Sequence, residues 1–349
     1  MEKIDLSAYL KENVVVDHLK FRDMPWVDKS KWRKHKWCPK AFELKTMEEM
    51  TGKLVTRDFD FGHDAMEMGS DAHLVFSHFF KAIVDNDLIA RFMEVPIEHE
   101  FKKSRLYYTF LDICNQILPE NLRSDPYRQR IISNFCEYQK DYWNQLSQQF
   151  NHKKWAFKKF FIPIYQELYL ENFDMMIYGT LDAMYHNPLY GTNTDWGDKK
   201  YTIIDYKGGN VPKGVKEGES STDMKSADRQ EMHVYAWLVA HAQKQVKDVD
   251  PVTMEEVIRN VKVFPDIEEY TDVIANMLFL GDDKPYYLPP MLMQNRSLEA
   301  IFKEIRRMRE TWTAGGKYAM VKMESAPYKC PACEYVNHCN SIRLKEAFN

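Results

Sequence analysis

Three charged residues with the spacing of a metal site lie in two short apolar segments of the sequence. Asp182 ends the segment Gly-Thr-Leu-Asp, while Asp205 and Lys207 flank Tyr206 in the segment Asp-Tyr-Lys. Side chains two residues apart on a β-strand point to the same face, and antiparallel pairing with the preceding strand brings Asp182 to the same place. Two carboxylates and the backbone carbonyl of Tyr206 supply the oxygen ligands that Mg²⁺ or Mn²⁺ prefers, and Lys207 is placed to hold or deprotonate a water. This combination predicts metal-dependent hydrolysis of a phosphodiester.

Four of the six cysteines have the positions of a second metal centre. Three of them cluster late in the sequence and the fourth, in a similar Cys-Pro context, lies early: Cys330, Cys333, Cys339 and Cys38. Four thiolates serve a zinc ion or a [4Fe-4S] cluster equally well, and His35 and His338 are candidate substitutes in a zinc site. The other two cysteines, Cys114 and Cys136, lie in apolar helical patterns that predict small buried hydrophobes.

These residues must be positioned by a fold that the apolar pattern predicts to be α+β. Between residues 30 and 156, apolar residues recur at three- and four-residue spacing, which predicts helices packed on one face. We expect sequential strands in three segments rich in aromatic and β-branched residues: Phe157–Glu171, Met175–Tyr185 and Tyr201–Tyr206. One further strand is predicted at Ile258–Phe264 and a surface helix at Leu298–Thr311. The expected architecture is a mixed central sheet flanked by helices, with a helical N-terminal half and a cysteine-rich C-terminal tail.

The same pattern predicts how the chain is divided. We expect residues 1–29 to be an N-terminal extension and residues 30–349 to form a single domain. Within that domain we expect a mostly helical part, a catalytic sheet core, and C-terminal helices with the cysteine tail, over residues 30–156, 157–270 and 271–349 respectively.

Composition restricts the class of protein. The 349 residues are 44% hydrophobic and have a formal net charge of −4, so any nucleic-acid-binding surface must be a local basic patch. The N-terminal segment has acids where a signal peptide would be basic, and no apolar run is long enough to span a bilayer. We therefore expect a cytoplasmic protein without membrane contact, in which clustered cysteines indicate metal rather than disulfides.

Six short segments occur in one order along most of the chain. They are Ser30–Phe42 with Cys38, Gly69–His73, Gly179–Asp182, Asp205–Lys207, Gln230–Tyr235, and the trio of Cys330, Cys333 and Cys339. An Asp-x-Lys segment alone is a weak signal, because a surface charge pair has the same pattern, but six elements in order are far more specific. Together they resemble the RecB-like branch of the PD-(D/E)XK nucleases, the group with a four-cysteine iron–sulfur cluster that includes a CRISPR-associated exonuclease and AddB-type nucleases.

The resemblance implies a restriction-endonuclease-like core and assigns a role to each matching residue. His73, Asp182, Asp205 and the carbonyl of Tyr206 would bind Mg²⁺ or Mn²⁺, and Lys207 would assist the attacking water. The four cysteines would hold a [4Fe-4S] cluster, with zinc as the alternative, and this cluster would join the early helix to the late tail. Glu167, on the strand before Asp182, is a candidate to support the metal through a water, but the favoured interpretation is a solvated strand acid.

One segment departs from the family pattern. The family carries a glutamine four residues before a tyrosine, whereas here Gln230 lies five residues before Tyr235 and Glu231 lies four before it. Residues four apart share a helix face, so Glu231 is the better geometric match, although Gln230 retains the chemistry. Gln230, Glu231 and Tyr235 are all kept as candidate catalytic residues.

Contact with DNA must come from local basic segments. One lies between Lys31 and Lys40, where Trp32 and Trp37 would stack on unpaired bases, and the other carries Lys153, Lys154, Lys158 and Lys159. A solvated basic face with buried tryptophans has the same pattern.

We expect an exonuclease acting on single-stranded or end-bearing DNA in repair, recombination, or CRISPR or viral DNA processing. A helicase or a CRISPR-adaptation protein is the expected partner. The alternative is a catalytically inactive iron–sulfur module on the same fold, which binds DNA or assembles a complex.

Overall fold

A mixed β-sheet forms the centre of the protein. The computed structural model describes residues 26–51, 63–85, 89–90, 100–211, 226–288, 295–313, 330, 333 and 335–340. Within these ranges five strands form one sheet in the order β1-β2-β3-β6-β7. The strands are β1 (Tyr165–Asn172), β2 (Ile177–His186), β3 (Tyr201–Lys207), β6 (Val273–Phe279) and β7 (Tyr286–Tyr287). All neighbours are antiparallel except β3 and β6, which are parallel. The predicted α+β fold with a mixed sheet is therefore confirmed.

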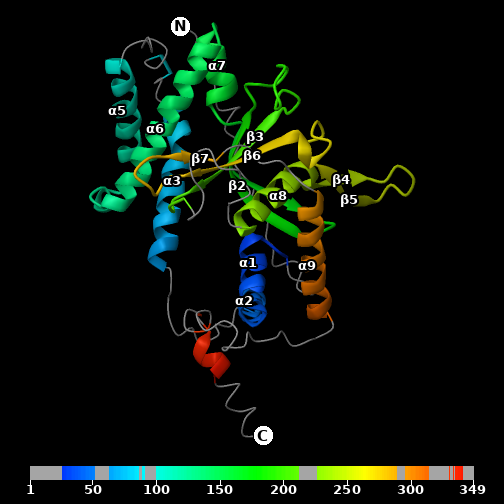
Figure 1. Cartoon of the computed structure of the whole chain (residues 1–349). Helices are drawn as coiled ribbons and strands as arrows, with labels where there is room; N and C mark the ends of the chain where they lie inside the picture. The colour runs from blue at the N-terminus through cyan, green and yellow to red at the C-terminus, as the bar shows by residue number, and fades with distance from the viewer. Residues whose placement is uncertain are drawn as a thin grey trace.

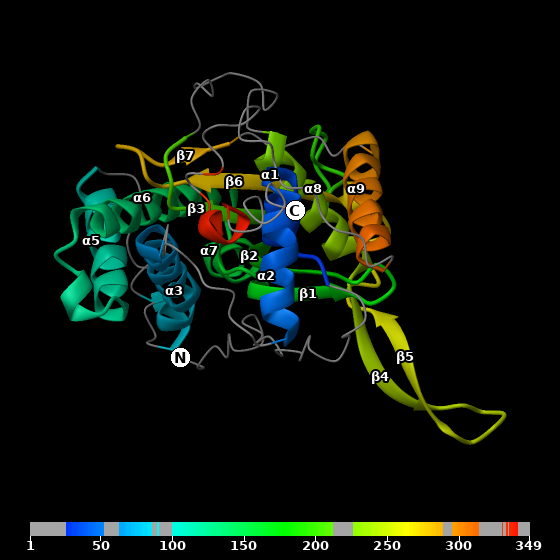
Figure 2. The same cartoon turned by 90° about the horizontal axis from the view of Figure 1, so that it is seen from below.

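Helices cover both faces of this sheet (Figures 1 and 2). One layer contains α3 (His63–Asp85), α5 (Glu100–Ile117), η3 (Glu120–Leu122), α6 (Pro126–Gln149), α7 (Lys153–Ala156) and the π-helical turn η4 (Phe157–Phe161). The other layer contains α1 (Lys29–Trp37), α2 (Pro39–Thr51), α8 (Ser226–His241), η6 (Tyr270–Asp272) and α9 (Asn295–Thr313). None of the helices in the described ranges combines the length and the apolar character needed to cross a membrane.

Alternation along the strands gives each helical layer its own core. On β3, Ile204 and Tyr206 pack with α3 and α6, whereas Ile203 packs with α8 and α9. This is the period of two expected for a sheet that is buried on both faces. Asp205 and Lys207 lie on β3 with the parity of Ile203, so the pleat carries them toward the α8 side.

Two sequence predictions for the strands need correction. The segment Phe157–Glu171 was expected to be one strand, but Phe157–Phe161 is a π-helical turn and β1 begins only at Tyr165. Pro163 lies between them, and a proline restricts the residue before it to extended backbone, which separates the helical turn from the strand. The many aromatic residues of this segment indicate burial and not a strand, because Phe157 and Phe161 are fully buried in the helical layer.

The predicted fourth strand lies outside the central sheet. It overlaps β5 (Glu256–Lys262), which pairs with β4 (Gln243–Val249) in a two-stranded hairpin that projects from the body (Figure 2). Neither β4 nor β6 was predicted. All seven residues of β6 are buried, and a short run buried on both faces lacks the alternation that identifies a strand.

Candidate functional site

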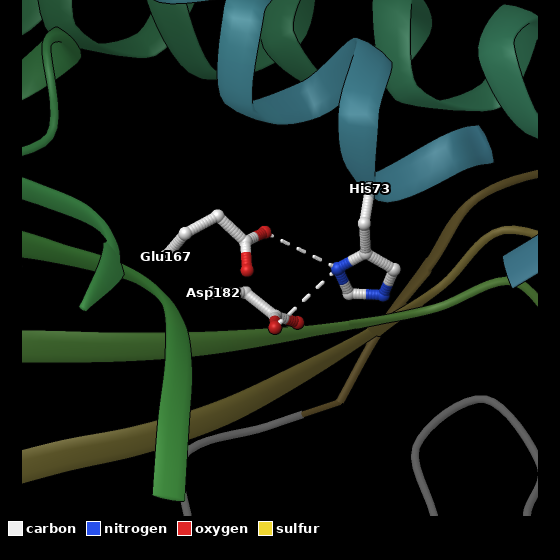
Figure 3. Close-up of side chains that lie close together, drawn as sticks. All are labelled: His73, Glu167 and Asp182. Carbon is white, nitrogen blue, oxygen red and sulfur yellow. Dashed lines mark ion pairs between the residues drawn. The ribbon is translucent and has the colours of Figure 1, made fainter. Parts of the chain in front are cut away.

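Three side chains that can bind a metal ion converge between α3 and the sheet (Figure 3). Nδ1 of His73, on α3, lies 3.4 Å from Oε1 of Glu167 and 3.4 Å from Oδ1 of Asp182. One ligand atom from each residue lies within 4.8 Å of the others. Carboxylate oxygens suit Mg²⁺ and Mn²⁺, and a neutral imidazole is a competent ligand, so these residues fit a divalent cation.

Packing on the sheet fixes the helix that carries His73. One turn later on α3, the ring of Phe76 stacks on Phe135 at 4.3 Å between centroids and contacts Tyr206 at 5.2 Å. The side-chain amide of Gln166, on β1, donates to the backbone carbonyl of Phe76 at 2.9 Å. Since Gln166 precedes Glu167, this bond holds Glu167 beside the helix.

The backbone of Glu167 is unusual for a residue inside a strand. Its φ of 46° lies in the left-handed region, which side chains other than glycine adopt at a cost of about 1–3 kcal/mol. Such conformations occur often at functional sites, where the surrounding structure maintains them. The sequence hypothesis treated Glu167 as a solvated acid, but the structure places it against His73 with 38% of its side chain exposed.

The two predicted acids lie where β2 and β3 diverge. The paired residues end at Ala183 and Ile204, and continuing that register places Asp182 opposite Asp205. At this point a side chain takes the place of the backbone hydrogen bonds between the strands. The backbone N–H of Tyr206 donates to Oδ2 of Asp182 at 2.6 Å. Both acids are almost fully buried. The register therefore brings two carboxylates to the end of a strand pair.

A network of cations surrounds Asp205 on the α8 side. Nζ of Lys207 lies 2.6 Å from Oδ2 of Asp205 and 3.0 Å from Oε1 of Glu231. Nζ of Lys29, at the start of α1, lies 2.5 Å from the same Glu231 oxygen and 3.6 Å from Oδ1 of Asp205. The other Glu231 oxygen contacts Nη2 of Arg33 at 2.9 Å. The buried carboxylate of Glu231 thus contacts three cations. Such pairing offsets the cost of burying a charge away from water.

Burial and neighbouring charge set the protonation of the metal-site residues. Burial raises the pKa of Asp182 to about 7, and the carboxylate of Asp205 adds to this effect. For His73, burial alone would lower the pKa, but the carboxylates of Asp182 and Glu167 outweigh it and raise the pKa to about 9. In the absence of a bound cation, His73 is therefore protonated at neutral pH.

The same forces act on the network around Lys207. Burial would lower the pKa of Lys207, but Asp205 and Glu231 outweigh it and hold the pKa above its usual value. Burial would raise the pKa of Asp205, but Lys207 and Lys29 hold it below its usual value. At neutral pH Lys207 is consequently an ammonium group and Asp205 a carboxylate.

Close packing of α8 against β2 places Glu231. A Cβ added to Gly179 would lie 3.0 Å from the ring of Tyr235, a tight contact, so glycine favours the close approach of α8 at this point. Glu231 and Tyr235 are both buried and lie one turn apart, whereas Gln230 is half-buried and accepts from Nζ of Lys36 at 2.8 Å. Of the two polar candidates, it is Glu231 that faces the charged network.

Sequence reasoning missed Lys29 and Arg33. They lie four residues apart on α1, a spacing that places both on one helix face, yet the segment contains so many basic residues that nothing singled them out. The same segment had two interpretations, contact with DNA or a basic face with buried tryptophans; Lys31 and Trp32 are buried, which for Trp32 agrees with the second. The signal that existed was only the position of the segment beside Cys38.

Cysteines from both ends of the sequence meet in a small separate core. Cys38, Cys333 and Cys339 are buried together with Tyr335, and Cys330 is half-buried, with its carbonyl accepting from the Cys333 N–H at 3.0 Å. The hydroxyl of Tyr335 donates to Oε2 of Glu48 on α2 at 2.9 Å. The three buried thiols therefore share one core, although Cys38 is far from the other two in the sequence. In contrast, Cys114 and Cys136 are buried in the helical layer, as predicted.

The chain matches one known family. A family model described as the PD-(D/E)XK nuclease superfamily matches residues 30–340. Searches of curated proteins and of solved structures gave no match. The matched range contains all the charged residues of the site except Lys29, and it also contains the four cysteines.

Proposed function

The chain belongs to the PD-(D/E)XK nuclease superfamily, and on this basis we propose that it is a metal-dependent deoxyribonuclease that acts as an exonuclease on single-stranded or end-bearing DNA. The observation that carries the proposal is the convergence of Asp182, Asp205 and Lys207 where β2 and β3 diverge, with His73 facing them from α3. If Asp205 and Lys207 formed only a structural ion pair, neither Asp182 nor His73 would be needed beside them.

Metal binding is proposed for the acids and the histidine. His73, Asp182, Asp205 and the carbonyl of Tyr206 would hold Mg²⁺ or Mn²⁺, and the position of Glu167 adds it to this set. A bound divalent cation activates water and stabilises charge on the phosphate. Without a cation, burial and the nearby carboxylate of Asp205 raise the pKa of Asp182. A bound cation would offset the repulsion between the two carboxylates.

Lys207 is proposed to donate hydrogen bonds to the water or to the phosphate. Its raised pKa keeps it protonated, which favours this role over the deprotonation of water. Lys29 contributes a second ammonium group whose side chain is 36% exposed, compared with 21% for Lys207. Because Lys29 is anchored on Glu231 and still reaches solvent, it can contact a phosphate that enters the site. Glu231 and Tyr235 would position the two lysines.

The four cysteines are proposed to hold a [4Fe-4S] cluster. Support comes from the shared core of Cys38, Cys333 and Cys339. Protein purified without oxygen should be brown and contain about four iron atoms per chain. Colourless protein with stoichiometric zinc would overturn the cluster and leave the nuclease proposal intact. A cytoplasmic location and a helicase or CRISPR-adaptation partner stay predictions.

The decisive experiment measures cleavage of end-labelled linear DNA, single- and double-stranded, with Mg²⁺ or Mn²⁺. We expect wild type to cut and Asp205→Asn to be inactive while it remains folded. Asp195→Asn, which changes an exposed acid in the loop between β2 and β3, is the matched control and should cut normally. Equal activity of Asp205→Asn would contradict the proposal. No cutting by a folded, cluster-loaded wild type would instead favour an inactive module that binds DNA or assembles a complex.

A further inference from the structure

A basic surface that the catalytic site does not use lies at α7 and the start of η4. An open hollow of about 850 Å³ is lined by Asn151, His152, Lys153, Lys154, Trp155 and Lys158. Lys153, Lys154 and Trp155 are exposed and Lys158 is half-exposed. The hollow therefore presents three ammonium groups and one aromatic ring to solvent.

The positive charge of this surface is uncompensated. The sequence has no Asp or Glu between residues 142 and 166, although the whole chain carries a net charge of −4. Among the described residues, Lys153, Lys154 and Lys158 form no ion pair with an acidic side chain. Like charges held together without counter-charges repel one another, so the surface gains from binding a polyanion.

Trp155 adds an exposed aromatic ring, which purely electrostatic binding of a polyanion would not need. Trp155 is 51% exposed, yet its ring makes T-shaped contacts with the rings of Phe150 at 5.6 Å and Phe160 at 5.1 Å between centroids. The ring is thus fixed in place before any ligand arrives, which reduces the entropy lost on binding. An immobilised aromatic ring among lysines is the arrangement that stacks on an unpaired base while cations contact phosphates.

This surface lies near the start of β3, whereas Asp205 and Lys207 lie near its end. Nζ of Lys159, on η4, lies 3.1 Å from Nε2 of His186, which pairs with Tyr201 at the start of β3. Asp205 and Lys207 lie toward the other end of the same strand, and Lys207 is about 20 Å from Tyr201 at the usual rise per residue. A stacked strand spans that distance with roughly six nucleotides at about 3.4 Å each.

We propose that α7 and η4 form a second, non-catalytic binding surface for single-stranded nucleic acid. Trp155 stacks on a base, Lys153, Lys154 and Lys158 contact the backbone, and the surface holds a strand whose end lies in the catalytic site. The identity of that strand as DNA, and its end in the site, rest on the proposed function; the binding itself does not.

The test measures binding by fluorescence anisotropy with labelled oligothymidylates of about 4 and about 20 nucleotides, in EDTA so that no cleavage occurs. The triple variant Lys153→Ala, Lys154→Ala, Lys158→Ala should reduce the slope of log K against log salt for the long strand by about 2, the value for three phosphate contacts. Trp155→Ala should weaken binding of the long strand about 5- to 150-fold, and Trp155→Phe should restore most of it. Binding of the short strand should change little.

A charge-matched control separates this surface from a general loss of charge. The triple variant Lys244→Ala, Lys284→Ala, Lys303→Ala removes three exposed lysines elsewhere and should leave the salt slope near that of wild type. An equal effect of both triples would overturn the proposal. Equal losses for duplex and single strand, with no effect of Trp155→Ala, would overturn the single-strand assignment. Wild type that binds the long strand through this surface but cuts no DNA with Mg²⁺ or Mn²⁺ would count against the proposed nuclease alone.

Discussion

Two regions of this protein collect cations, and they differ in what those cations face. In the proposed catalytic site Lys29, Arg33 and Lys207 all contact the buried carboxylate of Glu231. At α7 and η4 the lysines face solvent, with no acidic partner among the described residues. Paired cations are fixed in position and suit chemistry on one phosphate, whereas unpaired cations suit a mobile polyanion. Positive charge is therefore common to both regions, and the buried carboxylate partner is what distinguishes the cations of the proposed catalytic site.

The largest effect should follow removal of the best-paired cation. Lys207→Met keeps the length of the side chain and removes the ammonium group, so cleavage should fall about 10²- to 10⁴-fold. Single-turnover cleavage with saturating Mn²⁺ measures this change. Lys158→Met at the unpaired surface is the control, and its turnover of a short substrate should match wild type. Comparable losses in both variants would end the distinction between the regions.

Metal affinity should depend on pH because His73 carries a proton before the metal binds. Its pKa of about 9 means that the cation must displace that proton below pH 9, and below about pH 7 also the proton of Asp182. Apparent Mn²⁺ affinity should therefore rise about tenfold per pH unit from about pH 7 to 9. Titration calorimetry in buffers of different ionisation enthalpy measures the released proton. His73→Asn should remove the pH dependence in this range, and a dependence that persists would contradict the assignment.

Lys29 should have a smaller effect than Lys207, because it is more exposed and lies farther from Asp205. Lys29→Met should lower cleavage about tenfold to a hundredfold, and Lys29→Arg should recover most of the activity. If Lys29 contacts the phosphate, the change should appear in kcat/KM with metal affinity nearly unchanged. A loss of Mn²⁺ binding instead would show that Lys29 only arranges Asp205 and Glu231.

The smallest effect is expected where a pair exists without burial. On the β4–β5 hairpin, Nζ of Lys247 lies 3.8 Å from Oε2 of Glu256, and both side chains are about four-fifths exposed, at 81% and 78%. Exposed ion pairs contribute about 0–1 kcal/mol. Lys247→Met should therefore leave the urea midpoint and the cleavage rate close to wild type. A clear destabilisation would show that pairing matters without burial.

Much of the site could be predicted because its residues lie on strands with a clear period. Asp182, Asp205 and Lys207 were placed together from the rule that alternate residues share a face, and the structure has that arrangement. Glu231 and Gln230 were both kept as candidates, with Glu231 the better match from helix geometry, and it is Glu231 that faces the lysines. Local periodicity is sufficient when a site is built from neighbouring segments.

The rest depends on contacts that no local pattern encodes. Lys29 reaches Glu231 across about two hundred residues, and the left-handed backbone of Glu167 results from its surroundings. The strand β6 was missed because a strand buried on both faces has no alternation, and the start of β1 was misplaced because buried aromatic residues also suit a helix. These errors concern tertiary packing, which overrides local preference.

The contact of Tyr335 with Glu48 also sets an order of events during synthesis. The two residues are separated by 287 positions in the sequence. Because a ribosome adds about 5–20 residues per second, Tyr335 is synthesised roughly 15 to 60 s after Glu48. Helix α1, which carries Lys29, adjoins this contact through Cys38 and is made early. The last described strand, β7, ends 48 residues before Tyr335, so a nascent chain would complete its sheet about 2 to 10 s before this contact can form. A premature stop before Tyr335 would leave α2 without this hydrogen bond.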